Sequence, residues 1–184
     1  MAVAPLDWER LAGYASVPFP PGWDTNEYVF FSPRDLGVHQ AIIDVVSCAS
    51  HRVMVNMYGY DDDQVDSVLH SKAADPDVVF VMNLDKSQSG GKHEKALLQP
   101  WAEALGTSVA VGHSIKSAIS HLKICVVDGL YVISGSTNWS LSGEQKQDNQ
   151  LTITRDSLKA ARYESIILLN HTAMKQQMET AKKK

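Results

Sequence analysis

The chain of 184 residues is 44% hydrophobic and 21% charged, with a formal net charge of −4. This composition is that of an ordinary globular protein and excludes a disordered or fibrous one, and the length suits one domain with a full hydrophobic core. No apolar run reaches the roughly 18 residues of a membrane span, and the N-terminus lacks the basic and then apolar pattern of a secretory signal, so we expect a cytoplasmic protein.

The first half of the chain predicts strands and helices in alternation. Residues 1–26 are expected to form an irregular extension that packs on the domain. Runs of β-branched and aromatic residues predict strands, and apolar residues at helical spacing predict helices. In chain order these are a strand at 28–31, a helix at 37–47, a strand at 52–58, a helix at 61–69 and a strand at 78–82. The acidic run 61–63 suits the N-terminus of its helix better than a metal site.

The second half continues the alternation after a polar, glycine-containing loop at 86–91. In chain order it predicts a helix at 92–105, strands at 108–111, 121–127, 130–133 and 150–155, and a helix at 157–177. Residues 179–184 are expected to be a mobile tail. The alternation predicts an α/β fold in which helices cover both faces of a mixed sheet. We expect a single domain at 27–178.

The most informative segment is residues 121–138, whose polar positions read H-x-K-x4-D-x6-G-S-x-N. The strands predicted at 121–127 and 130–133 are joined by Asp128-Gly129, which is a two-residue hairpin signal. Asp128 is therefore expected to be mainly a structural turn residue.

This hairpin places useful side chains at one end of the sheet. Because side chains alternate along a strand, His121 and Lys123 share one face, about 7 Å apart, and Leu122 points to the other face, where it is expected to be buried. Gly135 ends the return strand and lets the backbone approach a ligand closely. The phosphate donors expected beside it are exposed backbone N–H groups, the Ser136 hydroxyl and the Asn138 amide.

These groups suit attack on a phosphodiester. Neutral imidazole is a competent nucleophile at physiological pH, because its unperturbed pKa is about 6.5, and a covalent intermediate divides one difficult displacement into two easier steps. Lys123 and Asn138 can stabilise charge that develops on the phosphoryl oxygens. No metal is then required. The sequence shows no Cys-x2-Cys pair, no His-Glu-x-x-His and no calcium loop, so we expect no metal or other cofactor.

The motif resembles the signature of the phospholipase D superfamily, the HKD family, and every position fits. The resemblance implies an α-β-α sandwich and catalytic roles for His121, Lys123 and Asn138. It also implies an acidic residue about a dozen positions beyond the asparagine, which orients the histidine ring. Asp148, just before the next predicted strand, is the favoured candidate, and Glu144 is the competing one.

Departure of the leaving group needs a second histidine as general acid, which the superfamily takes from a second copy of the motif. Lysine follows two residues after His70, His93 and His121, but only His121 continues into the G-S-x-N part of the motif. We therefore expect a symmetric homodimer in which one His121 attacks the phosphorus and the partner's His121 donates the proton.

Charge is distributed unevenly along the chain. Residues 1–85 carry 13 acids and 4 bases, a net −9, whereas residues 86–184 carry 8 acids and 13 bases, a net +5. The basic half holds the motif, so a local positive groove is expected despite the negative total. The lysines expected around it are Lys86, Lys92, Lys95, Lys116 and Lys123.

Together these features predict a metal-independent endonuclease that cleaves nucleic-acid phosphodiesters through a phosphohistidine. DNA and RNA fit the sequence equally. Two alternatives remain open. One is a lipid hydrolase or phosphatidyl transferase of the phospholipase D type, and the other is a catalytically silent dimer that binds nucleic acid.

Overall fold

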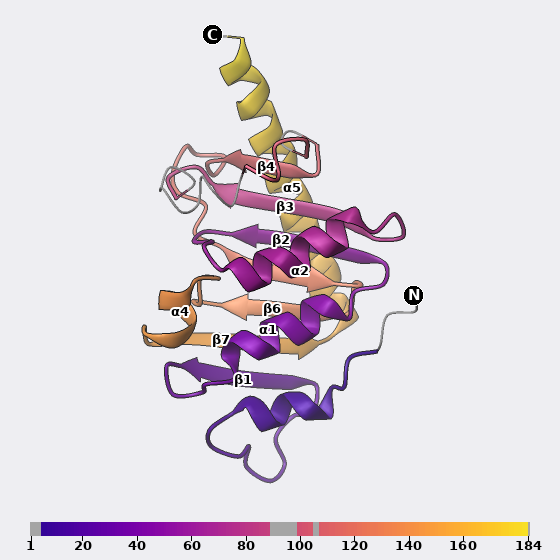
Figure 1. The fold of residues 1–184 in the computed structure, drawn as a ribbon, viewed down its shortest axis with the longest axis vertical. Coiled ribbons are helices and arrows are strands. Elements are labelled where there is room, and N and C mark those ends of the chain that lie inside the picture. Colours follow the sequence, from indigo (N-terminus) through magenta and orange to yellow (C-terminus); the bar gives the residue numbers. More distant parts are fainter. Residues whose placement is uncertain (1–4, 89–98, 105–106, 184) are drawn as a thin grey trace.

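The computed structural model describes residues 5–88, 99–104 and 107–183. They form a mixed seven-stranded sheet in the order β1-β7-β6-β5-β2-β3-β4 (Figure 1). Neighbouring strands are parallel from β2 to β4 and antiparallel elsewhere. The strands are β1 (Glu27–Ser32), β2 (Arg52–Met57), β3 (Val79–Asp85), β4 (Val109–Gly112), β5 (Lys123–Val127), β6 (Tyr131–Gly135) and β7 (Asn149–Arg155).

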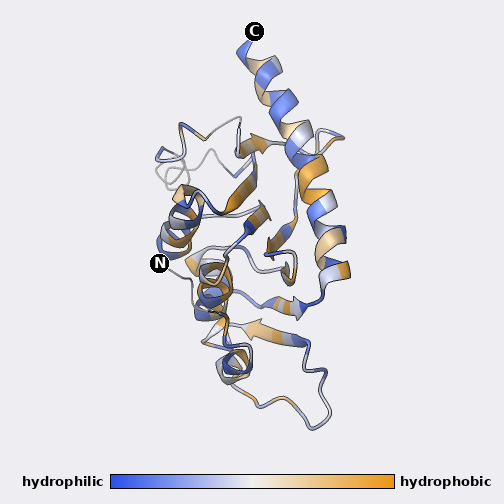
Figure 2. Cartoon of the chain, turned by 90° about the vertical axis from the view of Figure 1, so that its right-hand side faces the viewer, coloured by the Kyte–Doolittle hydropathy of each residue, from blue (hydrophilic) through white to orange (hydrophobic). Residues whose placement is uncertain are grey.

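Helices cover both faces of this sheet. α1 (Val38–Ser47) and α2 (Asp63–Ala74) pack on one face, and α5 (Ser157–Lys182) crosses the other (Figure 2). Alternate residues of β2 divide between the two interfaces, because side chains of a strand point to opposite faces. Val53 and Val55 belong to the larger core beneath α1 and α2, and Met54 belongs to the core beneath α5. The predicted α-β-α sandwich is confirmed.

Both ends of the described chain are more regular than expected. A 3-10 helix, Glu9–Tyr14, lies within the N-terminal extension, and its Leu11 is fully buried. α5 continues to Lys182, so the tail expected from residue 179 is largely helical. Its last turns contain Ala, Lys, Gln, Met and Glu, all of them strong helix formers, and neither glycine nor proline interrupts them. None of the helices in the described ranges has the length and apolarity to cross a lipid bilayer.

Two segments between the strands differ from the prediction. Residues 99–104 form turns where a helix was predicted at 92–105, and the rest of that range, 92–98 and 105, lies outside the described residues. Pro100 explains the difference, because proline lacks the N–H that a helix interior needs. A short helix, α4 (Leu141–Gln145), was not predicted. The Ser140 hydroxyl caps it by accepting a hydrogen bond from the N–H of Gly143.

The topology gathers the motif at one edge of the sheet. β2, β3 and β6 end there, and β5 and β7 begin there, on the left side of Figure 1. Segments far apart in the sequence therefore meet at the ends of adjacent strands, which is where ligands gather in open α/β sheets.

Candidate active site

Asp128 fixes the hairpin that carries the motif. Its backbone is left-handed, with φ of 53°, and its carboxylate accepts hydrogen bonds from the N–H groups of Ser50, His51 and Arg52 and from the Ser50 hydroxyl, at 2.8–3.0 Å. Partial burial raises the pKa of this carboxyl, but the hydrogen bonds outweigh burial and hold the pKa below its ordinary value. Asp128 thus joins the β5–β6 turn to the start of β2.

We expect Asp128→Ala to lower the free energy of unfolding by about 2–4 kcal/mol, because three backbone donors lose a charged acceptor. Asp128→Asn tolerates the left-handed backbone and keeps one acceptor oxygen, so it should lose less. Urea unfolding at several pH values measures both. Because folding lowers the pKa of Asp128, its stabilisation of the fold depends on pH. The stabilisation is complete above the unfolded-state pKa of about 3.9 and is lost as the pH falls through the lower pKa of the folded state. A difference between wild type and Asp128→Ala that persists unchanged in acid would contradict this origin.

Lys123 and His121 meet against one aromatic ring. Lys123 opens β5 and is 5% exposed. Its ammonium group donates to the carbonyl oxygen of His121 at 3.1 Å and lies 4.7 Å from the ring centre of Tyr58. The exposed imidazole of His121 packs edge-on against the same ring, with 4.5 Å between centres. Burial lowers the pKa of Lys123 to about 8. Within the described ranges no carboxylate pairs with this cation, so an incoming anion would be its counter-ion.

The loop after β6 is held close to β7. Gly135 has a φ of 149°, and a Cβ there would lie 2.1 Å from the carbonyl oxygen of Gln150, so only glycine fits. The Ser136 N–H donates to that same oxygen at 2.9 Å. The Ser136 hydroxyl donates to Asn149 Oδ1 and accepts from the N–H of Gln150, each at 3.0 Å. The Ser136 N–H is therefore not one of the exposed backbone N–H groups expected beside Gly135, and the Ser136 hydroxyl must turn from Asn149 to reach a ligand.

Asn138 is oriented by the loop after β2. Its Oδ1 accepts a hydrogen bond from the N–H of Gly59 at 3.1 Å. A Cβ on Gly59 would lie 2.8 Å from the Asn138 side chain, so this close approach also needs glycine. A bridge between Tyr60 and Trp139 extends the contact. With Oδ1 engaged, the Nδ2 group is the part of the amide that remains to donate to a phosphate oxygen.

The two acidic candidates lie in different surroundings. Asp148 is exposed and directly precedes β7. Glu144 is buried in α4, and its Oε2 lies 2.6 Å from Nδ1 of His39. Burial raises the pKa of Glu144 to about 7. In the described part of a single chain, neither carboxylate hydrogen-bonds to His121. Glu144 is engaged elsewhere, and Asp148 is left as the acid that faces solvent.

Sequence reasoning missed two residues at this edge. Tyr58 contacts both His121 and Lys123, and Asn149 contacts Ser136. The available signals were an aromatic residue and a glycine at the end of a predicted strand, and a polar residue at the start of the strand that follows the motif. Neither signal shows which residues are in contact, because the contacts depend on the order of the strands in the sheet.

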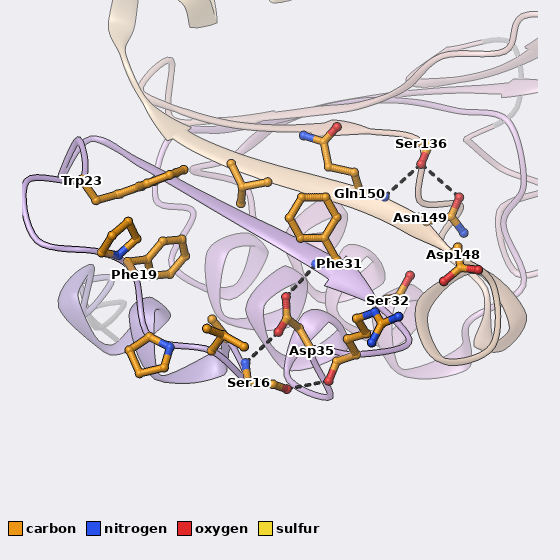
Figure 3. A pocket seen from close by; sticks show the side chains of 16 residues that line it. Ser16, Phe19, Trp23, Phe31, Ser32, Asp35, Ser136, Asp148, Asn149 and Gln150 are labelled. Atoms are coloured by element: carbon orange, nitrogen blue, oxygen red, sulfur yellow. Dashed lines mark hydrogen bonds between the residues drawn. The ribbon is translucent and has the colours of Figure 1, made fainter.

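An apolar hollow of about 740 Å³ adjoins the Ser136 loop. Figure 3 shows the aromatic side chains of Phe19, Trp23 and Phe31 along it, with Ser136, Asp148 and Asn149 at its polar end. Phe31 is 53% exposed and Trp23 is 36% exposed. The N-terminal extension thus forms one wall of a groove that leads to the loop after β6.

The assembled motif agrees with the comparison to protein families. Residues 42–180 match the family described as cardiolipin synthase, PLD-like domain. The chain belongs to the phospholipase D superfamily. Members of this superfamily are phosphodiesterases.

Curated relatives share a shorter stretch. The mitochondrial cardiolipin hydrolase of Xenopus laevis is 38% identical over 56 residues, which are 30% of this chain and 27% of the hydrolase. The protein of the same name from Xenopus tropicalis gives the same figures. The match therefore spans about a quarter of these relatives.

Solved structures share the fold over a longer stretch. Nuc from Salmonella typhimurium, a phospholipase D family member, superposes with a TM-score of 0.67 at 17% identity, covering 80% of this chain and 94% of Nuc. NucT from Helicobacter pylori gives a TM-score of 0.65 at 16% identity, covering 80% of this chain and 96% of NucT. The shared fold thus extends over nearly the full length of Nuc and NucT.

Proposed function

We propose that this protein is a metal-independent nuclease that cleaves phosphodiesters through a phosphohistidine at His121. The observation that carries the proposal is the buried ammonium group of Lys123, which lies beside an exposed imidazole. A desolvated cation without a paired carboxylate favours an anionic ligand, because the anion supplies the missing counter-charge. Lys123 and the Asn138 amide then stabilise charge on the phosphoryl oxygens.

The reaction divides into two displacements. A ring nitrogen of His121 attacks the phosphorus, a P–N bond forms and the P–O bond to the leaving alcohol breaks. The partner's His121, as imidazolium, gives its proton to the leaving oxygen. Water then attacks the phosphohistidine and loses a proton to the now neutral imidazole of the partner, and the P–N bond breaks. Each turnover restores one neutral and one protonated ring.

The surface beside His121 supports a dimer. Ile119 is 49% exposed and Leu122 is 37% exposed, so the expectation that Leu122 is buried within the chain is wrong. Exposed aliphatic side chains that flank a polar site suit contact with a second protein surface. A two-fold axis there would cover both residues, bring two His121 rings together and allow Asp148 to face the partner's His121.

Nucleic acid is the substrate class that the single motif, the chain length and the charge distribution favour. Single-motif chains of this length resemble the small endonucleases of the superfamily, and the half of the chain that holds the motif has a net charge of +5. A specific observation favours lipid as the second candidate. The apolar groove of Figure 3 ends at Ser136, and its lining of aromatic and aliphatic side chains suits an acyl chain.

One assay separates these candidates. Labelled single-stranded DNA, double-stranded DNA, RNA and cardiolipin vesicles are incubated in parallel with the protein in excess EDTA, at a temperature well below its melting point. We expect cleavage of nucleic acid to survive EDTA, because the proposed mechanism uses no metal. Activity confined to the vesicles would favour the lipid candidate. Loss of all activity that magnesium restores would contradict the mechanism.

The pKa of Lys123 predicts an alkaline limit to activity. The ammonium form predominates below about pH 8, so kcat/KM should fall as the pH rises through this value, because that ratio reports ionisations of the free enzyme. Bound phosphate stabilises the charged form and should move the corresponding limb of kcat to higher pH. In Lys123→Arg the guanidinium stays protonated, so any remaining activity should lack this limb. An unchanged limb in that variant would assign the ionisation to another group.

A further inference from the structure

A second cluster of ligand-type side chains lies on the face of the sheet that α1 and α2 cover. His39 comes from the first turn of α1, Asp62 is the N-cap of α2 and Glu144 lies in α4. Their side chains are 18%, 8% and 0% exposed, respectively. One ligand atom from each lies within 4.8 Å of the others. Three helices therefore converge on one small, nearly dry site.

Glu144 makes this cluster more than an ion pair. Its Oε2 is engaged by Nδ1 of His39, but its Oε1 is buried and has no hydrogen-bond partner among the described residues. Leaving a carboxylate oxygen buried and unsatisfied is costly, and in native proteins such an atom signals an absent water or ion.

The ring of His39 is oriented as a metal ligand requires. Its Nε2 lies 2.9 Å from Oε1 of Gln64, so this nitrogen donates to an amide oxygen. Its Nδ1 faces two carboxylates, with Glu144 Oε2 at 2.6 Å and Asp62 Oδ2 at 3.3 Å. Metal-bound histidines typically donate their second ring N–H to an oxygen in this way. The other carboxylate oxygen of Asp62 is fixed by the N–H groups of Gln64 and Val65.

We propose that His39, Asp62 and Glu144 bind a divalent transition-metal ion of the zinc type. One imidazole and two carboxylates neutralise a divalent charge, and these ligand types suit Zn²⁺. Bonds of about 2.0–2.2 Å in a tetrahedron place ligand atoms about 3.3–3.6 Å apart. The distance of 3.3 Å between His39 Nδ1 and Asp62 Oδ2 already matches this geometry. The distance of 2.6 Å between His39 Nδ1 and Glu144 Oε2 must increase when the ion replaces the proton that these two atoms share.

The site also has a route to solvent. A hollow of about 520 Å³ is bordered by His39, Asp62, Gln64 and Leu141. A water molecule from this hollow can occupy the fourth coordination position, as in zinc sites with three protein ligands.

Such an ion would brace the segments that hold the phosphate site without touching the reacting groups. Asp62 follows Tyr58 by four residues, and Glu144 follows Asn138 by six. These segments are already joined by the Gly59–Asn138 hydrogen bond and the Tyr60–Trp139 bridge. A metal at their far ends would hold Asn138 more firmly in place.

Zinc binding can be tested on untagged protein freed of metal by a chelator. Calorimetric titration with ZnCl2 should show one ion per chain, and the melting temperature should rise by about 5 °C or more at hundredfold excess over Kd. His39→Gln and Glu144→Gln each remove a direct ligand, so each should lower the affinity by more than the roughly 10- to 100-fold typical of an outer-shell partner. His51→Gln, which removes an exposed histidine elsewhere, is the matched control and should bind like wild type.

The outcomes are distinct from those of the nuclease proposal, because the readouts are binding and melting rather than cleavage. Equal zinc affinity in wild type and all three variants would place the ion elsewhere and overturn the assignment, as would failure of wild type to bind zinc. If a variant does not fold, the wild-type protein is titrated with Co²⁺ instead, and its visible absorption spectrum tests the site. Visible d–d absorption of tetrahedral cobalt that one equivalent of zinc abolishes is expected, and a spectrum like that of cobalt in buffer would reject the site.

Discussion

Replacing His121 with alanine is expected to lower kcat by about 10,000-fold or more, the scale of loss seen when a covalent nucleophile is removed. The fold should survive, because the imidazole is exposed and packs edge-on against the Tyr58 ring rather than in the core. Lys123 and Asn138 stay in place, so substrate binding should persist. Single-turnover kinetics and a binding titration on the same preparation measure the two effects separately.

The covalent intermediate gives this prediction its control. Acid-sensitive label from the scissile phosphate should be trapped on wild-type protein and on His51→Ala, which removes another exposed histidine. His121→Ala should trap none. Near-normal turnover by His121→Ala, or an unchanged yield of labelled protein, would show that another residue is the nucleophile.

The sequence predicted the hairpin of the motif because its signals are local. Runs of β-branched residues and the Asp128-Gly129 turn specify β5 and β6 without reference to the rest of the chain. The sandwich followed from the alternation of strands and helices. The end of α5 and the turns at residues 99–104 were mispredicted where helix propensity and a single proline, respectively, decide the outcome.

Contacts across the sheet and between helices were not predictable in this way. Tyr58 meets His121 only because β2 and β5 are neighbours, although the two residues lie 63 positions apart in the sequence. His39 and Glu144 meet across 105 residues. Both residue types have ordinary surface uses, so no local pattern marks them. Leu122 was placed in the core because strand alternation describes the faces of a sheet, and this residue lies just before β5 begins.

Subunit mixing is expected to give the second large effect, because the proposed reaction needs two copies of His121. Wild type and His121→Ala are unfolded together, refolded and assayed over a range of wild-type fractions. A site that requires both histidines makes activity follow the square of the wild-type fraction, so an equal mixture should retain about a quarter of the activity rather than about a half. A heterodimer holds one His121 and therefore lacks either the nucleophile or the acid.

The mixing experiment can be interpreted only if subunits of wild type and His121→Ala exchange, so the exchange is measured directly. Mass spectrometry of the refolded mixture should show heterodimers at the statistical proportion, and light scattering should show dimers of wild type at the assay concentration. Leu122→Lys provides a variant that keeps the motif but places charge on the surface that a partner would cover. We expect it to be monomeric and at least about 100-fold less active, because one His121 is then left without its acid. A monomeric wild type whose activity declines in simple proportion to its fraction would remove the shared site, and His113 of the same chain would then be the first acid to replace.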